Sequence, residues 1–323
     1  MKKYWLRYVI LFVGVTIAII TYNKELYEIF KNLRTISPST VVLMILCMTG
    51  YYVLDGVIIA KIFKHKYSDI RYRDGIACTY YCAFFRVVSL GGGSGIAEVV
   101  YMTKCGVDAA VASSISMIQY ILQKFTIVIL GVISYIVFYN DVDKLLGKYS
   151  DFMFIGVIMA FFIISMILMV CASKRFSNCI IWLLRKTGNK RFKAKIDKLE
   201  ETFKNLKSTT KDMFTRKKLL FEIIVINIVK LIVMFLTPYV LFHNKIDIVY
   251  SIAIFAISHM LAGVIPAPSG YGSLDVLFML LYGAIVGGEI AALLIVLFRF
   301  ANTIFAFIVG AIVYLLQFRS KSN

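Results

Sequence analysis

The sequence is poor in the residues that build metal centres, disulfide frameworks and flexible linkers. Its 323 residues include only 3 His, 4 Pro and 6 Cys. The cysteines lie mostly inside apolar segments, without metal-ligand spacing and without histidines nearby, so the pattern favours neither a zinc site nor a set of disulfides. We interpret them as small packing residues and expect no metal ion and no cofactor.

Enzyme signatures are also missing. There is no HExxH motif, no nucleophile elbow and no Walker loop, and no soluble segment is large enough for a nucleotide-binding or transfer-RNA-binding domain. We therefore assign no catalytic residue from these motifs and disfavour ATP-driven transport.

Acidic residues are scarce as well: 18 Asp and Glu stand against 36 Lys and Arg, giving a net charge of +18. The basic residues cluster in loops between apolar runs, as in cytoplasmic loops under the positive-inside rule. This distribution argues against nucleic acid as a partner.

Apolar residues, by contrast, are abundant. They make up 60% of the chain, with 15% aromatic residues and a mean hydropathy of +0.82, whereas soluble proteins average about 45–50% apolar. The composition predicts an all-α integral membrane protein with many spans. Lys2, Lys3 and Arg7 precede an apolar run without a convincing cleavage site, so we expect an uncleaved first span.

At about 20 apolar residues per crossing, six full spans are expected. The basic amino terminus, the loop 61–73, the stretch 174–218 and the tail are expected in the cytoplasm, which places both termini there. The less basic segments 23–37, 140–151 and 243–247 are expected outside. The six spans are 5–22, 39–63, 108–139, 152–172, 219–242 and 288–317.

Two further apolar regions, 75–107 and 248–287, are each broken by a glycine-rich stretch. Irregular backbone at membrane depth survives only where protein shields it or where it lines a polar cavity. By the parity of crossings, each region must return to the side from which it entered. Each is therefore either a re-entrant hairpin or a pair of short full spans, and the two enter from opposite faces.

The broken regions also resemble each other. A shift of 177 residues superposes Gly93 on Gly270, Gly95 on Gly272 and Glu98 on Asp275. Similar segments in opposite orientation predict inverted repeats, as in many secondary transporters, although chance similarity of glycine-rich apolar sequences is the alternative. We expect a single membrane domain over 1–323, with repeat-like halves at about 40–140 and 219–317.

The basic segment 173–218 joins these halves. Its apolar residues recur at helical spacing, which indicates an amphipathic helix on the inner leaflet. An ordinary solvated connector is the alternative.

Ionisable side chains inside spans are costly and are candidates for function. We favour those at or near the glycine breaks or well inside the following helix, whereas Lys104, Glu222 and Glu289 lie near span ends and are expected to reach the headgroups. The primary candidates are Arg86, Glu98, Asp275 and Arg299; the secondary ones are Lys124, His259 and Asn302; and the helix breaks are Gly93, Gly95, Pro266, Pro268, Gly270 and Gly272.

These residue types suit an amphiphilic anion or zwitterion. Helices restarting after Gly95 and Gly272 would direct free N–H groups and a positive dipole end at the breaks. Arg86 and Arg299 could bind phosphate. Glu98 and Asp275 could cap the helices, balance the arginines or contact an amine.

Other polar residues also fall into groups. Asn302 lies one turn from Arg299, and Gln119, Gln123 and Lys124 cluster in the span after the first break. Such groups indicate either a polar seam or interhelical hydrogen bonds that hold the bundle together.

The stretches from Ser89 to Gly106 and from Ile265 to Asp275, with Arg299 downstream, resemble the transmembrane, flippase-like region of the bacterial lysylphosphatidylglycerol synthase family, also known as multiple peptide resistance factors. The resemblance spans nearly the whole chain. It implies a bacterial inner-membrane protein that moves lysylphosphatidylglycerol or similar lipids between leaflets. The family's separate lysine-transferring domain is expected to be absent.

We therefore expect a lipid flippase whose partners are anionic or aminoacylated phospholipids, with no nucleic acid. The alternative is the membrane component of a phosphatidylglycerol lysyltransferase that lacks its own catalytic domain and contributes to resistance against cationic antimicrobial peptides. A headgroup transferase using Glu98 or Asp275 as a base, or a scaffold for a separate lipid-synthesis enzyme, are further possibilities.

Overall fold

The computed structural model describes residues 36–147, 150–172, 215–242, 245–264 and 272–319, together with isolated positions elsewhere. In these ranges the chain forms helices and no strands, which confirms the all-α membrane class. The expected span 5–22 and most of the basic segment 173–218 lie outside the described residues.

The described helices follow the expected spans closely. From the amino-terminal side they are α2 (Pro38–Lys64), α3 (Tyr72–Val88), α4 (Ser94–Lys104), α5 (Ala109–Val137), α6 (Tyr139–Leu146) and α7 (Ser150–Ala172). The later ones are α10 (Lys217–Phe235), α11 (Thr237–Phe242), α12 (Ile248–Ala262), α13 (Ser273–Val286), α14 (Gly288–Arg299), the π-helical η4 (Phe300–Ile304) and α15 (Phe305–Arg319).

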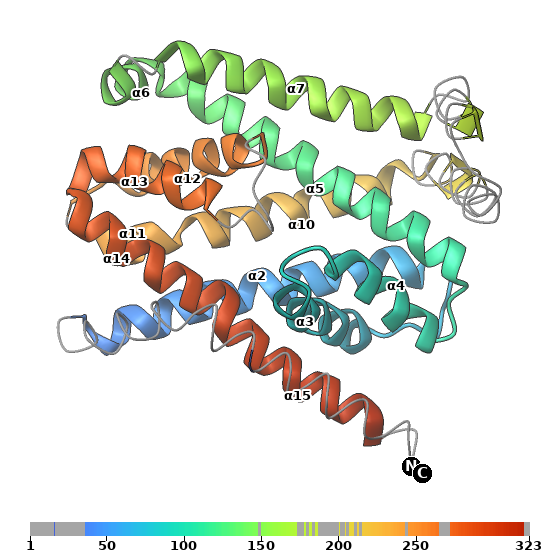
Figure 1. The fold of residues 1–323 in the computed structure, drawn as a ribbon. Helices are drawn as coiled ribbons and strands as arrows, with labels where there is room; N and C mark the ends of the chain where they lie inside the picture. Colours follow the sequence, from blue (N-terminus) through green and yellow to red (C-terminus); the bar gives the residue numbers. More distant parts are fainter. Residues whose placement is uncertain are drawn as a thin grey trace.

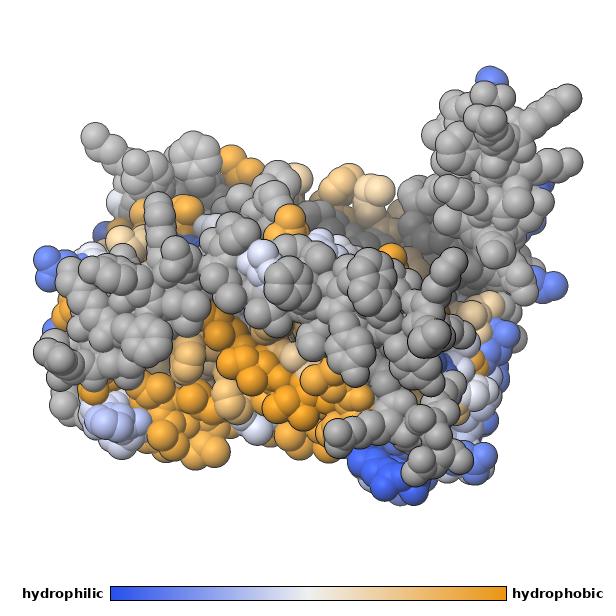
Figure 2. All heavy atoms as spheres, turned by 60° about the horizontal axis from the view of Figure 1, so that its bottom comes forward, coloured by the Kyte–Doolittle hydropathy of each residue, from blue (hydrophilic) through white to orange (hydrophobic). Residues whose placement is uncertain are grey.

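Four stretches are long and apolar enough to cross a membrane: 38–64, 109–137, 217–242 and 288–317. In Figure 1 the long helices α2, α5, α7 and α10 run roughly side by side across the view. Figure 2 shows hydrophobic side chains gathered over the middle of one face and hydrophilic ones at its two ends, as a lipid-embedded surface requires.

Both glycine-broken regions fold as pairs of short helices. We call α3 with α4 the first hairpin and α12 with α13 the second hairpin; the helices of each pair contact each other. The two hairpins lie toward opposite ends of the long helices (Figure 1), the first beside the end of α2 that carries Lys64 and the second beside α11. The inverted repeat inferred from the sequence stays a prediction.

Two expectations need small corrections. The helix after the first break begins at Ser94, so Gly95 lies inside its first turn and the break consists of residues 89–93. The segment 140–151, expected as an outside loop, contains the short helix α6, which begins directly after α5 has ended at Val137.

The stretch 217–242 is interrupted in a way that keeps a backbone carbonyl paired. Pro238 cannot donate to the carbonyl of Met234, and α10 gives way to α11 at this point. The hydroxyl of Thr237 donates to that same carbonyl at 2.7 Å. The bend therefore leaves this acceptor paired.

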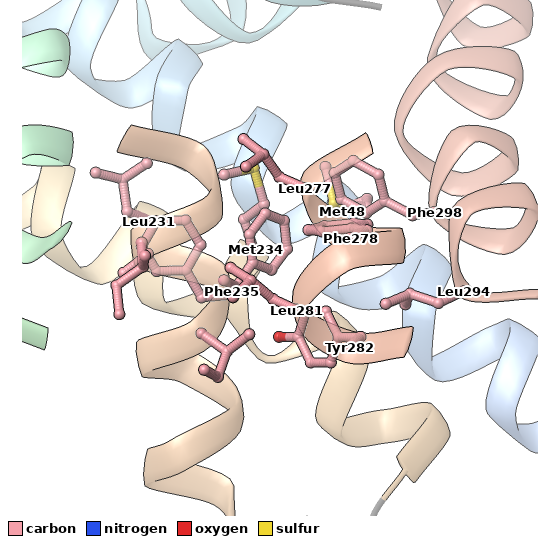
Figure 3. Packing of buried hydrophobic residues seen from close by; sticks show 14 of the residues in the cluster. Met48, Leu231, Met234, Phe235, Leu277, Phe278, Leu281, Tyr282, Leu294 and Phe298 are labelled. Carbon is pink, nitrogen blue, oxygen red and sulfur yellow. The ribbon is translucent and has the colours of Figure 1, made fainter. Parts of the chain in front are cut away.

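The buried apolar residues form two clusters, one for each hairpin. The first core packs α3, α4 and the beginning of α5, and the second core packs α12, α13 and α14 with α10. Figure 3 shows part of the second core, where Phe278 and Phe298 face Met234 and Phe235 across the helices. Phe255 meets Phe278 and Phe298 edge to face, with ring centroids 4.9 and 5.4 Å apart.

Helices α2 and α3 cross at two glycines. A Cβ built on Gly75 would overlap the carbonyl oxygen of Gly56 and lie 2.8 Å from atoms of Ala60. The first hairpin therefore needs a residue without a side chain at this crossing.

We expect Gly75→Ala to destabilise the protein by about 1–3 kcal/mol, because the extra methyl group forces the two helices apart. The lower unfolding temperature of the detergent-solubilised protein would report this loss. Gly95→Ala is the matched control, since a Cβ there meets nothing within 4 Å. Equal unfolding temperatures for the two variants would contradict the close crossing.

Candidate functional site

Buried polar side chains gather where the two cores meet. On α2 the last residue of the second core is Tyr52, and the first residue of the first core is Ile58. Asp55 lies between them. On α5 and α10 the same boundary is occupied by polar residues. We call this group the central polar cluster: Tyr51, Asp55, Gln119, Gln123, Asn227 and Lys230.

An ion pair between α2 and α10 forms the middle of this cluster. The Nζ of Lys230 donates to Oδ1 of Asp55 at 2.8 Å, and the Lys230 side chain is 0% exposed while that of Asp55 is 17% exposed. Gln119 of α5 donates to the same Oδ1 at 3.5 Å. An ammonium so deeply buried in a membrane span requires a partner charge, and Asp55 supplies it.

The rest of the cluster is only partly satisfied. Gln123 donates to the hydroxyl of Tyr51 at 3.1 Å, and Lys230 lies 5.4 Å from the centre of the Tyr51 ring. In contrast, both amide atoms of Asn227 and the Oε1 of Gln119 are buried without a hydrogen-bond partner. Unsatisfied buried polar atoms are rare in folded proteins and mark places where a ligand, water or ion completes the bonding.

Two further basic groups lie beside the second hairpin. Lys124 of α5 is partly buried, and its Nζ lies 3.9 Å from the position that a Cβ on Gly263, the residue after α12, would occupy. His259 of α12 interacts electrostatically with Lys124 and Lys230, and its Nδ1 is buried without a hydrogen-bond partner. On the side of the second hairpin, the central polar cluster is therefore bordered by a lysine and a histidine.

The first hairpin brings an acid to the opposite side. Glu98 of α4 accepts a hydrogen bond from Ser116 of α5 at 2.6 Å and interacts electrostatically with Asp55. It does not cap the start of α4, where no side-chain cap is present. The break itself is held by Ser89, whose hydroxyl accepts from the N–H of Gly93 at 2.7 Å.

Arg86, near the end of α3, acts electrostatically on Tyr51. Arg86, Glu98 and Asp55 also all act on the thiol of Cys82. Two of the four primary candidates, Arg86 and Glu98, thus belong to the first hairpin.

The other two primary candidates form a separate pair. Arg299 donates to both carboxylate oxygens of Asp275, from Nε to Oδ1 at 3.3 Å and from a terminal nitrogen to Oδ2. Asp275 also accepts from the N–H of Gly272 at 3.0 Å and so caps α13. Asp275 therefore has two of the roles that were considered for it: it caps a helix, and it is the counter-ion of Arg299.

Asn302 lies in the π-helical turn η4, just after Arg299. The hydroxyl of Tyr52 donates to the Asn302 carbonyl at 2.6 Å and lies 3.2 Å from its Oδ1. A π-helical turn frees a backbone carbonyl from the regular ladder and is often found at functional sites. Tyr52 therefore ties this turn to α2, next to the central polar cluster.

We expect Tyr52→Phe to cost about 1–3 kcal/mol of stability, because it removes the hydrogen bonds that the Tyr52 hydroxyl makes to the partly buried Asn302. The unfolding temperature in detergent measures the effect. Tyr139→Phe, on an exposed ring of α6, is the control and should change little. A Tyr52 variant as stable as this control would show that the contact contributes nothing.

Lys104, Glu222 and Glu289 lie near helix ends, as expected. Glu222 pairs with Lys61 of α2 at 2.6 Å, and both side chains are about one-third exposed. Lys104 lies 3.2 Å from the hydroxyl of Tyr81 and 3.3 Å from Oε1 of Gln317. Glu289 is exposed.

The residues selected from the sequence do not include the ion pair of the central polar cluster. Asp55 and Lys230 were among the ionisable residues of the spans but were not selected, because they lie far from either glycine break in the sequence. A usable signal existed: charges of opposite sign occur well inside two different spans, and buried charges in membranes pair.

Pro266, Pro268 and Gly270 lie outside the described residues. Within the described ranges no group of three His, Cys, Asp or Glu side chains could hold a metal ion.

Together, the fold and the site define a polytopic helical membrane protein with charged groups buried between two helical hairpins. The sequence matches the family described as the lysylphosphatidylglycerol synthase TM region over residues 4–310. The chain therefore belongs to this family, as its resemblance had indicated. A comparison with curated proteins gave no match.

Proposed function

We propose that this protein is a lipid flippase that moves an amino-containing phospholipid or another phospholipid, such as lysylphosphatidylglycerol, between the leaflets of the bacterial inner membrane. Its partners would be membrane phospholipids, and both termini would lie in the cytoplasm. The family supports a role in membrane-lipid metabolism, and the transport step is our own proposal.

The observation that carries the proposal is the position of the buried charges. Asp55 and Lys230 lie on two membrane-spanning helices, at the boundary between the two cores, and the hairpins of these cores lie toward opposite ends of the long helices (Figure 1). A lipid headgroup must cross the apolar interior of the bilayer, where an unsolvated charge is very costly. Fixed charges of both signs at this depth lower that barrier, and the hairpins offer movable elements on either side.

The proposal is tested by a leaflet-resolved assay on purified protein in proteoliposomes. Fluorescent phosphatidylglycerol, phosphatidylethanolamine and lysylphosphatidylglycerol are placed in one leaflet, and the fraction that stays accessible to a membrane-impermeant quencher is followed over time. We expect accelerated movement of at least one lipid over protein-free vesicles. Rates equal to those of protein-free vesicles for all three lipids would refute the proposal.

A second candidate function follows from the family's name: the membrane component of a lysylphosphatidylglycerol synthase, acting with a separate lipid-synthesis enzyme and contributing to resistance against cationic antimicrobial peptides. Expression of the separate lipid-synthesis enzyme with and without this chain, followed by mass spectrometry of the lipids, separates the two. A new headgroup lipid would favour synthesis. An unchanged lipid profile with altered leaflet distribution favours transport.

A further inference from the structure

The first hairpin carries an acid that differs from the other acids of the bundle. Glu98 is partly buried and accepts a hydrogen bond from a neutral donor, the hydroxyl of Ser116, at 2.6 Å. Among the described residues, no Lys or Arg acts on its carboxyl; Arg86 of α3 acts on Cys82 instead. By contrast, three other acids are paired with a base on a different helix: Asp55 with Lys230, Asp275 with Arg299, and Glu222 with Lys61.

The sequence explains this difference. The shift of 177 residues that superposes Glu98 on Asp275 places Leu122 at the position of Arg299. Leu122 belongs to α5, the helix that packs against α4. The first broken region thus keeps the acid of the second one, but an apolar residue takes the place of the base.

The titratable groups around Glu98 also disfavour a negative charge there. Asp55 of α2 acts on Glu98 electrostatically and is itself an acid. From α3 the thiols of Cys78 and Cys82 face Glu98, and from α5 the hydroxyl of Ser116 does. A carboxylate in this position has no cation and faces a like charge, and both are unfavourable inside a membrane. The neutral, protonated acid avoids both penalties.

The helix that carries Glu98 is short and is bounded by sharp turns. Helix α4 has 11 residues. Before it, Leu90 has φ +51° and Gly91 has φ +105°, and after it Gly106 has φ +92°. A left-handed backbone favours glycine and is strained at a residue with a side chain, such as Leu90. A movement of α4 can therefore be absorbed at its two ends, and the bond from Ser116 to Glu98 joins it to α5.

We propose that Glu98 is a proton-binding site that controls the packing of α4 against α5. With the proton bound, the neutral carboxyl accepts the hydrogen bond from Ser116 and α4 stays packed. When the proton passes to water, the carboxylate is repelled by Asp55, and α4 moves so that water hydrates the charge. The proton site goes beyond the proposed function, whereas its use in lipid movement rests on that function.

The direction of the pH effect follows from linkage. The packed state disfavours the carboxylate, so it holds the proton more tightly than the released state, in which the acid meets water. Low pH therefore favours packing, and rising pH favours release. Over the range in which only the packed state keeps its proton, each pH unit weakens packing by about tenfold.

The first test detects the proton. Infrared spectra of the purified full chain in lipid films are recorded as the pH is raised from about 5, where exposed Asp and Glu are already ionised because their pKa is about 4. A C=O band of a protonated carboxyl then reports an acid shielded from water. We expect this band in the wild type, its loss as the pH rises, and its absence throughout in Glu98→Gln. Glu289→Gln, at an exposed acid, is the control and should keep the band.

The second test measures the packing of α4. Hydrogen exchange of the amides of 94–104 is compared between the wild type and Glu98→Gln at a mildly acidic and a mildly basic pH. Glutamine keeps the acceptor for Ser116 without titrating, so this variant should fold with α4 packed, and the intrinsic effect of pH on exchange cancels in the comparison. We expect equal exchange at acidic pH and about tenfold faster exchange of the wild type at basic pH. Ser116→Ala removes the donor but keeps the acid, so it should exchange faster than the wild type at both pH values.

Either of two results would overturn the inference. One is a wild type without the carboxyl band, or a Glu98→Gln protein that retains it, because Glu98 would then not hold the proton. The other is a ratio of exchange rates between the wild type and Glu98→Gln that does not change with pH, because the proton would then not control α4.

Proteoliposomes show whether the proton site and lipid movement are connected. We expect the wild type to move lipid about tenfold faster at basic than at acidic pH, and Glu98→Gln to be slow at both. The same pH dependence in both proteins would leave the flippase standing and refute the connection. If neither protein moves lipid at any pH, the flippase is refuted, and the infrared and exchange results still decide the proton site.

Discussion

Replacing Asp55 by asparagine is expected to destabilise the protein by about 3–5 kcal/mol, the usual consequence of removing one partner from a buried ion pair. The reason is that Lys230 is 0% exposed and its ammonium would lose its carboxylate. Thermal unfolding of the purified protein in detergent, compared with the wild type, measures the effect.

Two controls show whether charge burial is the cause. Glu222→Gln breaks an ion pair between the same two helices, but its side chain is 34% exposed, so the loss of stability should be much smaller than that of Asp55→Asn. The double variant D55N/K230Q should recover most of the stability lost by D55N, because no charge is then left unpaired. A double variant less stable than D55N alone would contradict this explanation.

Replacing Arg299 by alanine is expected to slow lipid movement at least about tenfold while the protein still inserts, since a hydrogen-bonded charge contributes about 1.5–3 kcal/mol to binding. Arg299 contacts both oxygens of Asp275, which caps the helix that follows the second break. Its loss removes a candidate phosphate ligand and the counter-ion of that cap. The proteoliposome assay measures the rate, and the amount of protein in the membrane fraction reports insertion.

Arg299→Lys and Glu289→Gln make this prediction specific. Lysine keeps the charge but not the forked geometry that reaches two oxygens, so an intermediate rate is expected. Glu289 is exposed at the start of α14, and its replacement should leave the rate unchanged. An Arg299→Ala protein with wild-type lipid asymmetry would count against both the residue's role and the proposed function.

Much of the architecture could be predicted from the sequence, because the length of an apolar run and the charge of its flanks act locally. The stretches 39–63 and 219–242 differ from the observed 38–64 and 217–242 by at most two residues at an end. Of the second break the structure describes Gly272, whose φ of +96° is a backbone conformation that favours glycine. What could not be predicted were interruptions such as η4, in which the carbonyl of Asn302 accepts a hydrogen bond from Tyr52, 250 residues earlier in the chain.

The candidate site was harder to predict because it also depends on contacts between residues that are far apart in the sequence. The pairing of Asp275 with Arg299 was among the possibilities because both residues follow the second break closely. Asp55 and Lys230 are 175 residues apart, and only the packing of α2 against α10 brings them together. Glu98 and Asp275 occupy equivalent places in the sequence yet do different things: one binds Ser116, the other caps a helix. Similar motifs acquire different partners because the helices that surround them differ.

The two ion pairs between α2 and α10 have a mechanical consequence. Lys61 with Glu222 and Asp55 with Lys230 fasten the two helices at separate heights, about two turns apart. A single ion pair would let the two helices rotate about it, whereas two ion pairs also prevent the helices from twisting or sliding past one another. Helices α2 and α10 therefore form a rigid pair, and any rearrangement that admits a lipid must come from other helices that move relative to this pair.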